Sequence, residues 1–439
     1  MFHRNGWLVK NIFCERTVSE MPSEENVWQL LVGRGLHEIR QYGSGVRGPA
    51  RLSAIAGIAD FLLESAAERK ASDLHLEPFE GKLRIRYRQD GILIADAFSP
   101  VPSELAAALL SRLKVMGGMD IAQHRRPQDG HIRYEYQGIK LDIRVSVMPA
   151  AEGEMMVLRF MDLGGSVRTI TELGFSKENR RRFESLVHRP SGLLPICGPM
   201  NSGKTTSLYA ALQELNQPDR NLITLEDPIE RQLSGVNQVQ LNEKAGLDYA
   251  AGLRAILRQD AETILLGEIR DEQTAELAVR IALTGHLVMT TLHTENAVSA
   301  IFRLFEMGIP PYLMAATLSG VVAQRLVRCL CPHCKETWEV RPGSSEAALF
   351  GESYVSGMRL WRGMGCPHCH GTGYSGRMAI QEVLVVDAAL REAILTRKDR
   401  RELSDLAIRA GMKTLWQDGL EKAAAGGTSL AEVRRVLYG

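Results

Sequence analysis

The sequence of 439 residues has no excess of charge of either sign. Its 53 lysines and arginines face 52 aspartates and glutamates, for a formal net charge of +1. This balance offers no bulk electrostatic attraction to nucleic acid or to anionic lipid. An apolar run near the ~18–20 residues that cross a bilayer is also lacking, as is a signal-peptide pattern at the start. We therefore expect a cytoplasmic protein that binds no nucleic acid and associates with a membrane only through partners.

Cysteine is sparse, and its placement excludes a disulfide framework. Four of the seven cysteines lie in two Cys-Pro-His-Cys tetrads, Cys331–Cys334 and Cys366–Cys369. Each tetrad offers two thiolates from a tight turn, and two tetrads together make a closed tetrahedral zinc site. The predicted zinc ligands are Cys331, Cys334, Cys366 and Cys369. His333 and His368 lie inside the tetrads and are alternative ligands, while Cys14, Cys197 and Cys329 are expected to be ordinary buried or free thiols.

The N-terminal part of the chain changes character twice. Residues 1–47 are interpreted as a short segment with a linker at Gly43-Ser44-Gly45, because they show no strong period before the glycines. Residues 48–165 combine one helix pattern with alternating strands that turn at Asp90-Gly91 and Gln137-Gly138. These features predict a small α+β domain.

The remainder alternates short apolar strands with helices, which predicts an α/β domain with a parallel sheet over residues 166–325. The expected strands are Leu193–Cys197, Leu222–Leu225, Thr263–Leu266 and Leu287–Thr291. Residues 326–385 hold the tetracysteine region, and residues 386–439 form a helical region. In that region Ser429-x-x-Glu432 is the pattern of a capping box that opens the last helix.

A phosphate-binding loop follows the first of these strands, in the sequence Gly198-Pro-Met-Asn-Ser-Gly-Lys204-Thr205. Its backbone N–H groups and the next helix would hold the phosphates of ATP, with Lys204 on the β- and γ-phosphates and Thr205 on Mg²⁺. A chance glycine-rich turn is the alternative. The expected phosphate-contacting residues are Gly198, Pro199, Met200, Asn201, Ser202, Gly203, Lys204, Thr205 and Thr206. Pro195 cannot donate to a strand ladder, so we expect a bulge or an irregular strand there.

Carboxylates follow the next two strands, in the segments Glu226–Glu230 and Gly267–Asp271. Acidic residues that leave parallel strands at their carboxyl ends meet the nucleotide crevice, where they can hold Mg²⁺ or orient a water. Glu226 and Asp227 are assigned to nucleotide binding on this basis. Acidic residues that merely begin helices are the alternative explanation.

Histidines and arginines provide further candidates. His286 and His293 flank the strand Leu287–Thr291, so that one of them could sense the γ-phosphate, although strand-end histidines are often structural. Arginines that would neutralise phosphate charge are expected among ordinary surface arginines. The candidates are Arg254, Arg258, Arg270 and, from the first domain, Arg144.

Together these motifs resemble the secretion ATPase family that powers type II secretion and type IV pilus assembly. The similarity runs from about Ala71 to the C-terminus. Beyond the segments above it includes Ser72–Pro78, Arg126–Gly130, Leu141–Ser146, Ala323–Arg328 and Thr372–Arg377. The resemblance implies a PAS-like domain before a RecA-like ATPase domain, a ring of six subunits, and an inner-membrane platform protein as partner. It also implies that Glu230 is the catalytic carboxylate and Glu268 the Walker B glutamate. The four-cysteine insert favours the assembly and secretion branch of the family.

The sequence departs from the family pattern at the phosphate-binding loop, where Met200-Asn201 replaces the usual Thr-Gly. Asn201 would then occupy a backbone position that favours glycine. His131 stands where arginine is common, which removes one possible phosphate contact. Two alternatives stay open at this stage: a RecA-like motor that translocates nucleic acid, and a nucleotide-binding scaffold with weak catalysis.

Overall fold

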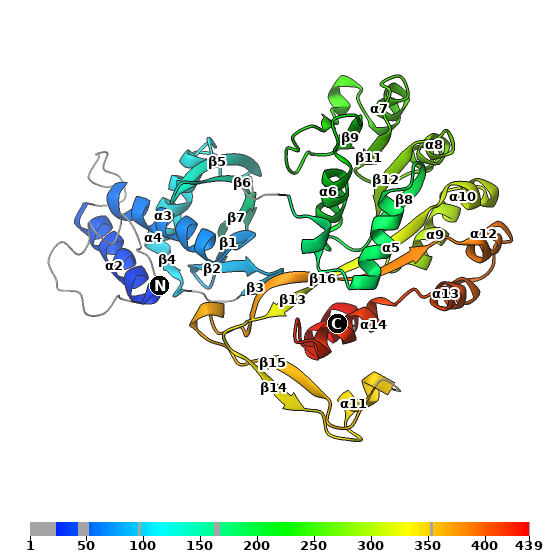
Figure 1. Ribbon diagram of the computed structural model, residues 1–439. Helices are drawn as coiled ribbons and strands as arrows, with labels where there is room; N and C mark the ends of the chain where they lie inside the picture. The colour runs from blue at the N-terminus through cyan, green and yellow to red at the C-terminus, as the bar shows by residue number, and fades with distance from the viewer. Residues whose placement is uncertain (1–22, 43–51, 95–97, 162–166, 352–353, 439) are drawn as a thin grey trace. The chain divides into compact units, whose positions relative to one another are not determined.

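The computed structural model describes residues 23–42, 52–94, 98–161, 167–351 and 354–438, and divides the chain into two compact units. Unit 1 comprises Met1–Gly165 and unit 2 comprises Ser166–Gly439 (Figure 1). The linker predicted at Gly43-Ser44-Gly45 and the thiol of Cys14 lie outside the described residues. Among the residues described, no helix combines the length and the apolar character that crossing a membrane requires.

Unit 1 is built on an antiparallel sheet in the order β3-β2-β1-β7-β6-β5, with β4 paired to β2. Both predicted hairpin turns are present, and the two residues of each turn have positive φ: 50° and 85° at Asp90-Gly91, 50° and 79° at Gln137-Gly138. The strands are β1 Asp73–Phe79, β2 Lys82–Gln89, β3 Ile92–Ile94, β4 Val101–Pro102, β5 Gln128–Tyr136, β6 Ile139–Ala150 and β7 Gly153–Met161.

Helices α3 Leu52–Glu68 and α4 Ser103–Met116 pack on one face of this sheet, and α2 Glu24–Tyr42 packs against both of these helices (Figure 1). The inward strand positions supply the other half of the core, as the alternation Leu83-Ile85-Tyr87 predicts. For Glu24–Tyr42, helix α2 corrects the expectation of a segment separate from the domain. Its Trp28 is fully buried and stacks on Phe98 at a centroid distance of 5.4 Å, so α2 belongs to the core of unit 1.

Unit 2 contains a seven-stranded sheet in the order β10-β9-β11-β12-β8-β13-β16, parallel except for β16. The four predicted strands are all present. The strands are β8 Gly192–Cys197, β9 Leu222–Glu226, β10 Asn237–Gln240, β11 Thr263–Leu266, β12 Leu287–Leu292, β13 Gly320–Leu330 and β16 Tyr374–Val385.

Helices pack on both faces of this sheet and enclose two cores. In β8, Leu193 and Cys197 belong to one core, whereas Leu194 and Ile196 belong to the other. Burial on both faces explains why the strands are almost continuously apolar. The helices are α5 Lys177–Val187, α6 Lys204–Leu215, α7 Tyr249–Ile256, α8 Glu272–Leu283, α9 Ala297–Glu306, α10 Pro311–Thr317, α12 Ala388–Leu395, α13 Arg400–Arg409, α14 Leu415–Ala424 and α15 Leu430–Tyr438. Short 3₁₀ turns are η2 Ile170–Leu173, η3 Glu243–Ala245 and η5 Pro367–Cys369.

The irregularity expected at Pro195 occurs on one side of β8 only. Against β12 the register is continuous from Gly192 to Cys197. Against β13 it shifts by one residue between the Leu193–Leu318 bridge and the Ile196–Val322 pair. The missing N–H of Pro195 faces this interrupted side, because the Leu193 carbonyl accepts from Ser319 there.

The cysteines lie at the far end of the β13–β16 pair, where a small hairpin branches off. It consists of β14 Lys335–Glu339 and β15 Arg359–Gly363, with α11 Ser345–Phe350 beside it. Their apolar side chains form a core with Leu420 and Leu430. The boundary expected between residues 325 and 326 falls inside β13, which is one continuous strand of the main sheet.

Helix α15 begins as the Ser429-x-x-Glu432 pattern predicts, but only half of the capping box forms. The Ser429 hydroxyl accepts from the Glu432 N–H at 3.1 Å. The Glu432 carboxylate instead accepts from the backbone N–H of Arg328 at 3.1 Å and from the guanidinium groups of Arg328 and Arg435 at 2.7 Å each. The acidic residue thus anchors the last helix to β13.

Candidate functional site: a nucleotide edge and a cysteine cluster

The phosphate-binding loop connects β8 to α6 at the carboxyl edge of the sheet. Three of its residues have left-handed backbone: Gly198 with φ 154°, Asn201 with φ 60° and Gly203 with φ 84°. Asn201 therefore occupies a conformation that favours glycine, as the sequence predicted. Asparagine is among the few other residues that adopt it readily. The replacement is compatible with the shape of the loop.

Lys204 is enclosed by this loop. Its ammonium donates to the carbonyl oxygens of Gly198 and Pro199, at 2.9 Å each, and the residue is only 9% exposed. Burial lowers the pKa of Lys204, and the carboxylates of Glu268 and Glu230 act in the opposite direction. Both predicted acidic residues therefore lie within electrostatic reach of the lysine.

Glu230 approaches the loop from the end of β9. The Thr205 hydroxyl donates to its Oε1 at 3.3 Å. The residue assigned to Mg²⁺ and the residue assigned to catalysis are thus neighbours, although 25 positions separate them in the sequence.

Glu268 follows β11 and is held by two neighbouring side chains. Arg270 hydrogen-bonds its Oε1, and His293 Nε2 lies 3.3 Å from Oε2. Burial alone would raise the pKa of Glu268, but Arg270 and His293 more than offset it and the pKa is lowered. The Glu268 carboxylate is therefore ionised at neutral pH.

The turn that carries Glu268 is fixed to both neighbouring strands. Gly267 N–H donates to Leu225 O at 2.8 Å, and the Thr291 hydroxyl donates to Gly267 O at 2.8 Å. Backbone contacts of this kind place the carboxylate at the same edge of the sheet as the phosphate-binding loop.

The four predicted cysteines converge on one point. Their Sγ atoms all lie within 4.8 Å of one another, with Cys331–Cys366 and Cys334–Cys369 at 3.8 Å. Backbone N–H groups of Cys366 and Gly373 point at Cys369 Sγ from 3.2 Å and lower its pKa to about 6, against the effect of burial. Four thiolates at tetrahedral spacing fit a zinc ion, which would stabilise the fold of this region.

The alternative histidine ligands have another arrangement. The rings of His333 and His368 stack on each other at a centroid distance of 4.1 Å, on the exposed side of the tetrads. The group of side chains able to enclose a metal in the described part of the chain consists of the four cysteines. Cys197 is buried, as expected for a structural thiol, and donates to Asn296 O at 3.5 Å.

Comparison with known proteins now identifies the family. The sequence matches the family described as "Type II/IV secretion system protein" over residues 50–435. The chain belongs to this secretion system family. It is 45% identical over 382 residues to the type II secretion system ATPase E of Vibrio cholerae, covering 87% of this chain and 75% of the relative. It is also 45% identical over 374 residues to the type IV pilus assembly ATPase PilB of Thermus thermophilus, covering 85% of this chain and 42% of the relative.

Solved structures agree at the level of the fold. The pilus retraction motor PilT with bound ADP superposes with a TM-score of 0.55 at 25% identity, covering 85% of this chain and 95% of that structure. The ATPase DotB of Legionella pneumophila gives a TM-score of 0.62 at 21% identity, covering 86% and 94%. Unit 1 and unit 2 therefore have a mixed α/β architecture shared with secretion ATPases.

The environment of Glu226 corrects its assignment to nucleotide binding. It is 3% exposed, and its two oxygens accept from Tyr209 on α6, from Thr224 at 2.6 Å and from Gln238 at 3.1 Å. These bonds tie α6, β9 and β10 together. The carboxylate is thus engaged in packing rather than directed at a nucleotide.

The position of His286 corrects its assignment to the nucleotide site. It precedes β12, and its backbone carbonyl pairs with Gly192 at the start of β8. Its ring contacts the Thr284 hydroxyl and the Ile281 carbonyl oxygen. Because the strands are parallel, His286 lies at the amino edge, about 20 Å of extended chain from His293 at the carboxyl edge. Of the two histidines, only His293 joins the site.

The predicted arginines are not gathered in one place. Arg270 contacts Glu268, which raises the pKa of Arg270 against the effect of burial, and Asp227 lies close enough to act in the same direction as Glu268. Arg254 and Arg258 are exposed at the end of α7. Arg144 belongs to unit 1, where it is exposed and pairs in register with Arg159. Roles for these last three remain predictions.

Two residues near the site were not among the predicted site residues. Tyr249 begins α7, and its hydroxyl lies close to Gly267; burial and Glu268 raise its pKa to about 12. Gln324 on β13 donates a hydrogen bond to the Ser202 carbonyl of the phosphate-binding loop. The available clues were its place in the segment Ala323–Arg328 and its position as a polar residue directly after the apolar run Val321-Val322-Ala323.

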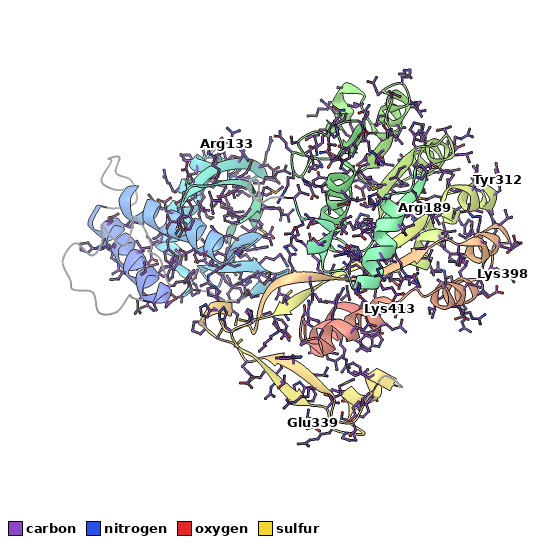
Figure 2. All side chains as sticks on the ribbon, in the orientation of Figure 1. Arg133, Arg189, Tyr312, Glu339, Lys398 and Lys413 are labelled. Atoms are coloured by element: carbon purple, nitrogen blue, oxygen red, sulfur yellow. The ribbon has the colours of Figure 1, made fainter. Side chains whose placement is uncertain are left out.

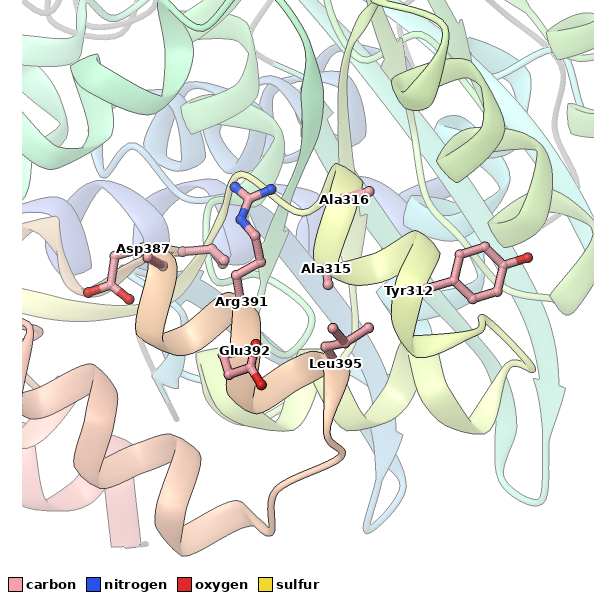
Figure 3. A pocket seen from close by; sticks show the side chains of 9 residues that line it. Tyr312, Ala315, Ala316, Asp387, Arg391, Glu392 and Leu395 are labelled. Carbon is pink, nitrogen blue, oxygen red and sulfur yellow. The ribbon is translucent and has the colours of Figure 1, made fainter.

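Charged side chains and a pocket are also found outside these two sites. Labelled charged side chains of both signs, such as Arg133, Glu339 and Lys398, are exposed at separate places on the fold (Figure 2). A pocket of about 590 Å³ lies between α10 and α12 and is lined by Tyr312, Arg391 and Leu395 among others (Figure 3). None of the predicted site residues lines it.

Proposed function

We propose that this chain is a motor subunit that hydrolyses ATP at the carboxyl edge of the unit 2 sheet and drives assembly of a type II secretion pseudopilus or a type IV pilus. The observation that carries the proposal is the convergence of Lys204, Thr205 and Glu230. Their contacts join a phosphate-binding loop to a carboxylate from another strand. The names of the relatives, both ATPases, support the same activity.

The residues divide the work as follows. Backbone N–H groups of the loop Gly198–Thr206 and the Lys204 ammonium bind the phosphates. Thr205 and Glu268 hold Mg²⁺, which when bound neutralises phosphate charge. Glu230 orients the attacking water. His293 keeps Glu268 in place through the contact at 3.3 Å.

Charge on the transferred phosphate requires cations from outside the loop. Arg270, which contacts Glu268, is one candidate within unit 2, and Arg254 and Arg258 are further candidates. Arg144 is the candidate from unit 1. Its exposure on β6 leaves it available to a nucleotide bound by its own chain or by a neighbouring copy.

The resemblance to the family supports a proposal for the assembly as well. Unit 1 corresponds to a PAS-like domain and the main part of unit 2 to a RecA-like domain, and six copies form a ring. The four cysteines hold a structural Zn²⁺. An inner-membrane platform protein is the partner through which this cytoplasmic ATPase associates with the membrane, and nucleic acid is not a substrate.

Turnover measurements test this proposal. Glu230→Gln removes the charge that orients water but keeps a hydrogen-bond acceptor for Thr205, so steady-state ATP turnover is expected to fall about 100-fold with nucleotide affinity retained. The matched control is Glu243→Gln, an exposed acidic residue on η3, which leaves turnover unchanged. Equal turnover in the wild type and Glu230→Gln would refute the assignment of Glu230.

A further inference from the structure

Gln324 is a buried polar residue on β13, outside the segments that the proposed function uses. It is 2% exposed, yet both ends of its carboxamide are hydrogen-bonded. Nε2 donates to the Ser202 carbonyl of the phosphate-binding loop at 2.8 Å. Oε1 accepts from the Ser207 hydroxyl of α6 at 2.8 Å. One side chain therefore bridges the loop and the helix that follows it.

The glycines of the loop lie directly against this residue. A Cβ added to Gly198 would come within 2.5 Å of the Gln324 backbone oxygen. A Cβ added to Gly203 would come within 2.9 Å of Gln324 Nε2. Besides permitting positive φ, glycine at these two positions allows the loop to rest on β13.

The bond to Ser202 has a consequence for the next N–H group. The peptide unit between Ser202 and Gly203 is planar and trans, so its carbonyl and its N–H point in opposite directions. Because Gln324 holds the carbonyl on the β13 side, the Gly203 N–H is directed away from β13. Inward N–H groups of this kind are what a loop needs in order to bind an anion.

We infer that Gln324 is a positioning residue for phosphate binding: its neutral carboxamide fixes the Ser202–Gly203 peptide so that the Gly203 N–H faces the nucleotide phosphates. The inference rests on the proposed function, because it concerns the same nucleotide site. Gln324 itself does not contact the nucleotide.

The neighbouring strand supplies a matched control. Gln381 on β16 pairs in register with Gln324 and is fully buried. Its carboxamide donates to Leu173 O at 3.2 Å and accepts from Lys422 at 2.9 Å, so its bonds do not involve the loop. Gln324→Met and Gln381→Met thus remove the same groups from adjacent positions in one sheet.

The test compares the affinity of these full-length variants for a fluorescent ADP analogue, together with the KM and kcat of ATP hydrolysis. Gln324→Met is expected to weaken ADP binding about tenfold and to raise KM by a similar factor, with kcat changed by less than about threefold. Gln381→Met is expected to lower the melting temperature at least as much and to leave the Kd unchanged. An unchanged Kd in Gln324→Met, or an equal rise in both variants, would overturn the inference.

A second variant keeps the test decisive if Gln324→Met does not fold. Gln324→Glu has the same shape, but its ionised form cannot donate to Ser202 O. The ratio of its Kd to that of the wild type should be large at about pH 8.5 and fall towards one at about pH 6, where the protonated buried carboxyl donates again. A ratio independent of pH contradicts the inference. Failure of the wild type to bind ADP would instead reject the proposed function and this inference together.

Discussion

One strand of unit 2, β13, connects the nucleotide edge to the cysteine cluster, but the two sites are stabilised differently. β13 carries Gln324 under the phosphate-binding loop and leads, past its end, to Cys331. At the nucleotide edge each charged group already has a protein partner: Lys204 has two carbonyls, and Glu268 has Arg270 and His293. At the cluster the four sulfur atoms face one another.

This difference indicates that the two sites depend on their ligands in different ways. A site whose polar groups are satisfied by the chain keeps its shape without a nucleotide, and the ligand then adds binding energy. Four thiol groups directed at one point gain their stability from a metal, so that metal binding is part of folding there. The following predictions test that separation, beginning with the largest expected free-energy change.

Removal of the metal is expected to unfold the cysteine region locally. Chelation, or the substitution Cys366→Ser, should cost more than about 5 kcal/mol in the β14–β15 hairpin because the structural ion supplies much of its folding energy. Hydrogen exchange should increase sharply over residues 331–375 and little over residues 192–215. Cys329→Ser, which changes a cysteine outside the cluster, is the control. Uniform loss of protection in both ranges would show that the two sites are not separate.

Glu432 fixes the end of β13 that lies nearest the cluster. Burial would raise its pKa, but hydrogen bonds from Arg435 and Arg328 lower it to about 2. A carboxylate with a lowered pKa stabilises the fold above its unfolded pKa of about 4.3, and this stabilisation disappears as the pH falls towards 2. Glu432→Gln should therefore cost about 3 kcal/mol at pH 7 and progressively less at lower pH.

Urea denaturation at several pH values measures this effect. The matched control is Glu421→Gln, an exposed acidic residue on α14, for which we expect a change below about 0.5 kcal/mol. ATP affinity should be the same in both variants if the hydrogen bonds of Glu432 stabilise only the end of β13 near the cysteines. A large change in ATP affinity would link the two sites through β13.

Lys204→Ala is expected to have the opposite effect, because it changes the nucleotide edge and leaves the cysteine cluster intact. Loss of the ammonium should weaken ATP binding about 100-fold, or about 2.7 kcal/mol. Metal content should stay unchanged, and stability without nucleotide should change little, since burial already lowers the pKa of this lysine. Unchanged binding of a fluorescent ATP analogue would reject Lys204 as the phosphate ligand.

The same contrast explains what the sequence could predict. The phosphate-binding loop, the hairpin turns and the cysteine tetrads are local patterns, in which backbone conformation or ligand chemistry restricts nearby residues. Such patterns predicted Asn201 at positive φ and the convergence of four thiol groups. The strand-end acids Glu230 and Glu268 were also found, because parallel strands bring their carboxyl ends together.

Errors arose where a partner distant in sequence decides the role. Glu226 lies at the carboxyl end of a parallel strand, where a nucleotide ligand is expected, but Tyr209 and Gln238 hold its carboxylate in the interior. Glu432 fits a capping box, yet Arg328, 104 positions away, captures its side chain. His286 could have been excluded from the sequence alone, because a residue that precedes a parallel strand lies at the amino edge.

The smallest predicted effect concerns Glu226. Tyr209→Phe removes the hydroxyl that donates to this buried carboxylate, while Thr224 and Gln238 remain as donors. If Glu226 is structural, the variant should lose about 1 kcal/mol of stability and retain the ATP affinity and turnover of the wild type within about twofold. If Glu226 instead binds the nucleotide, release of its carboxylate should change the Kd for ATP more than the free energy of unfolding. Urea denaturation and ATP titration of this one variant therefore decide whether the carboxylate at the end of β9 belongs to the core or to the nucleotide edge.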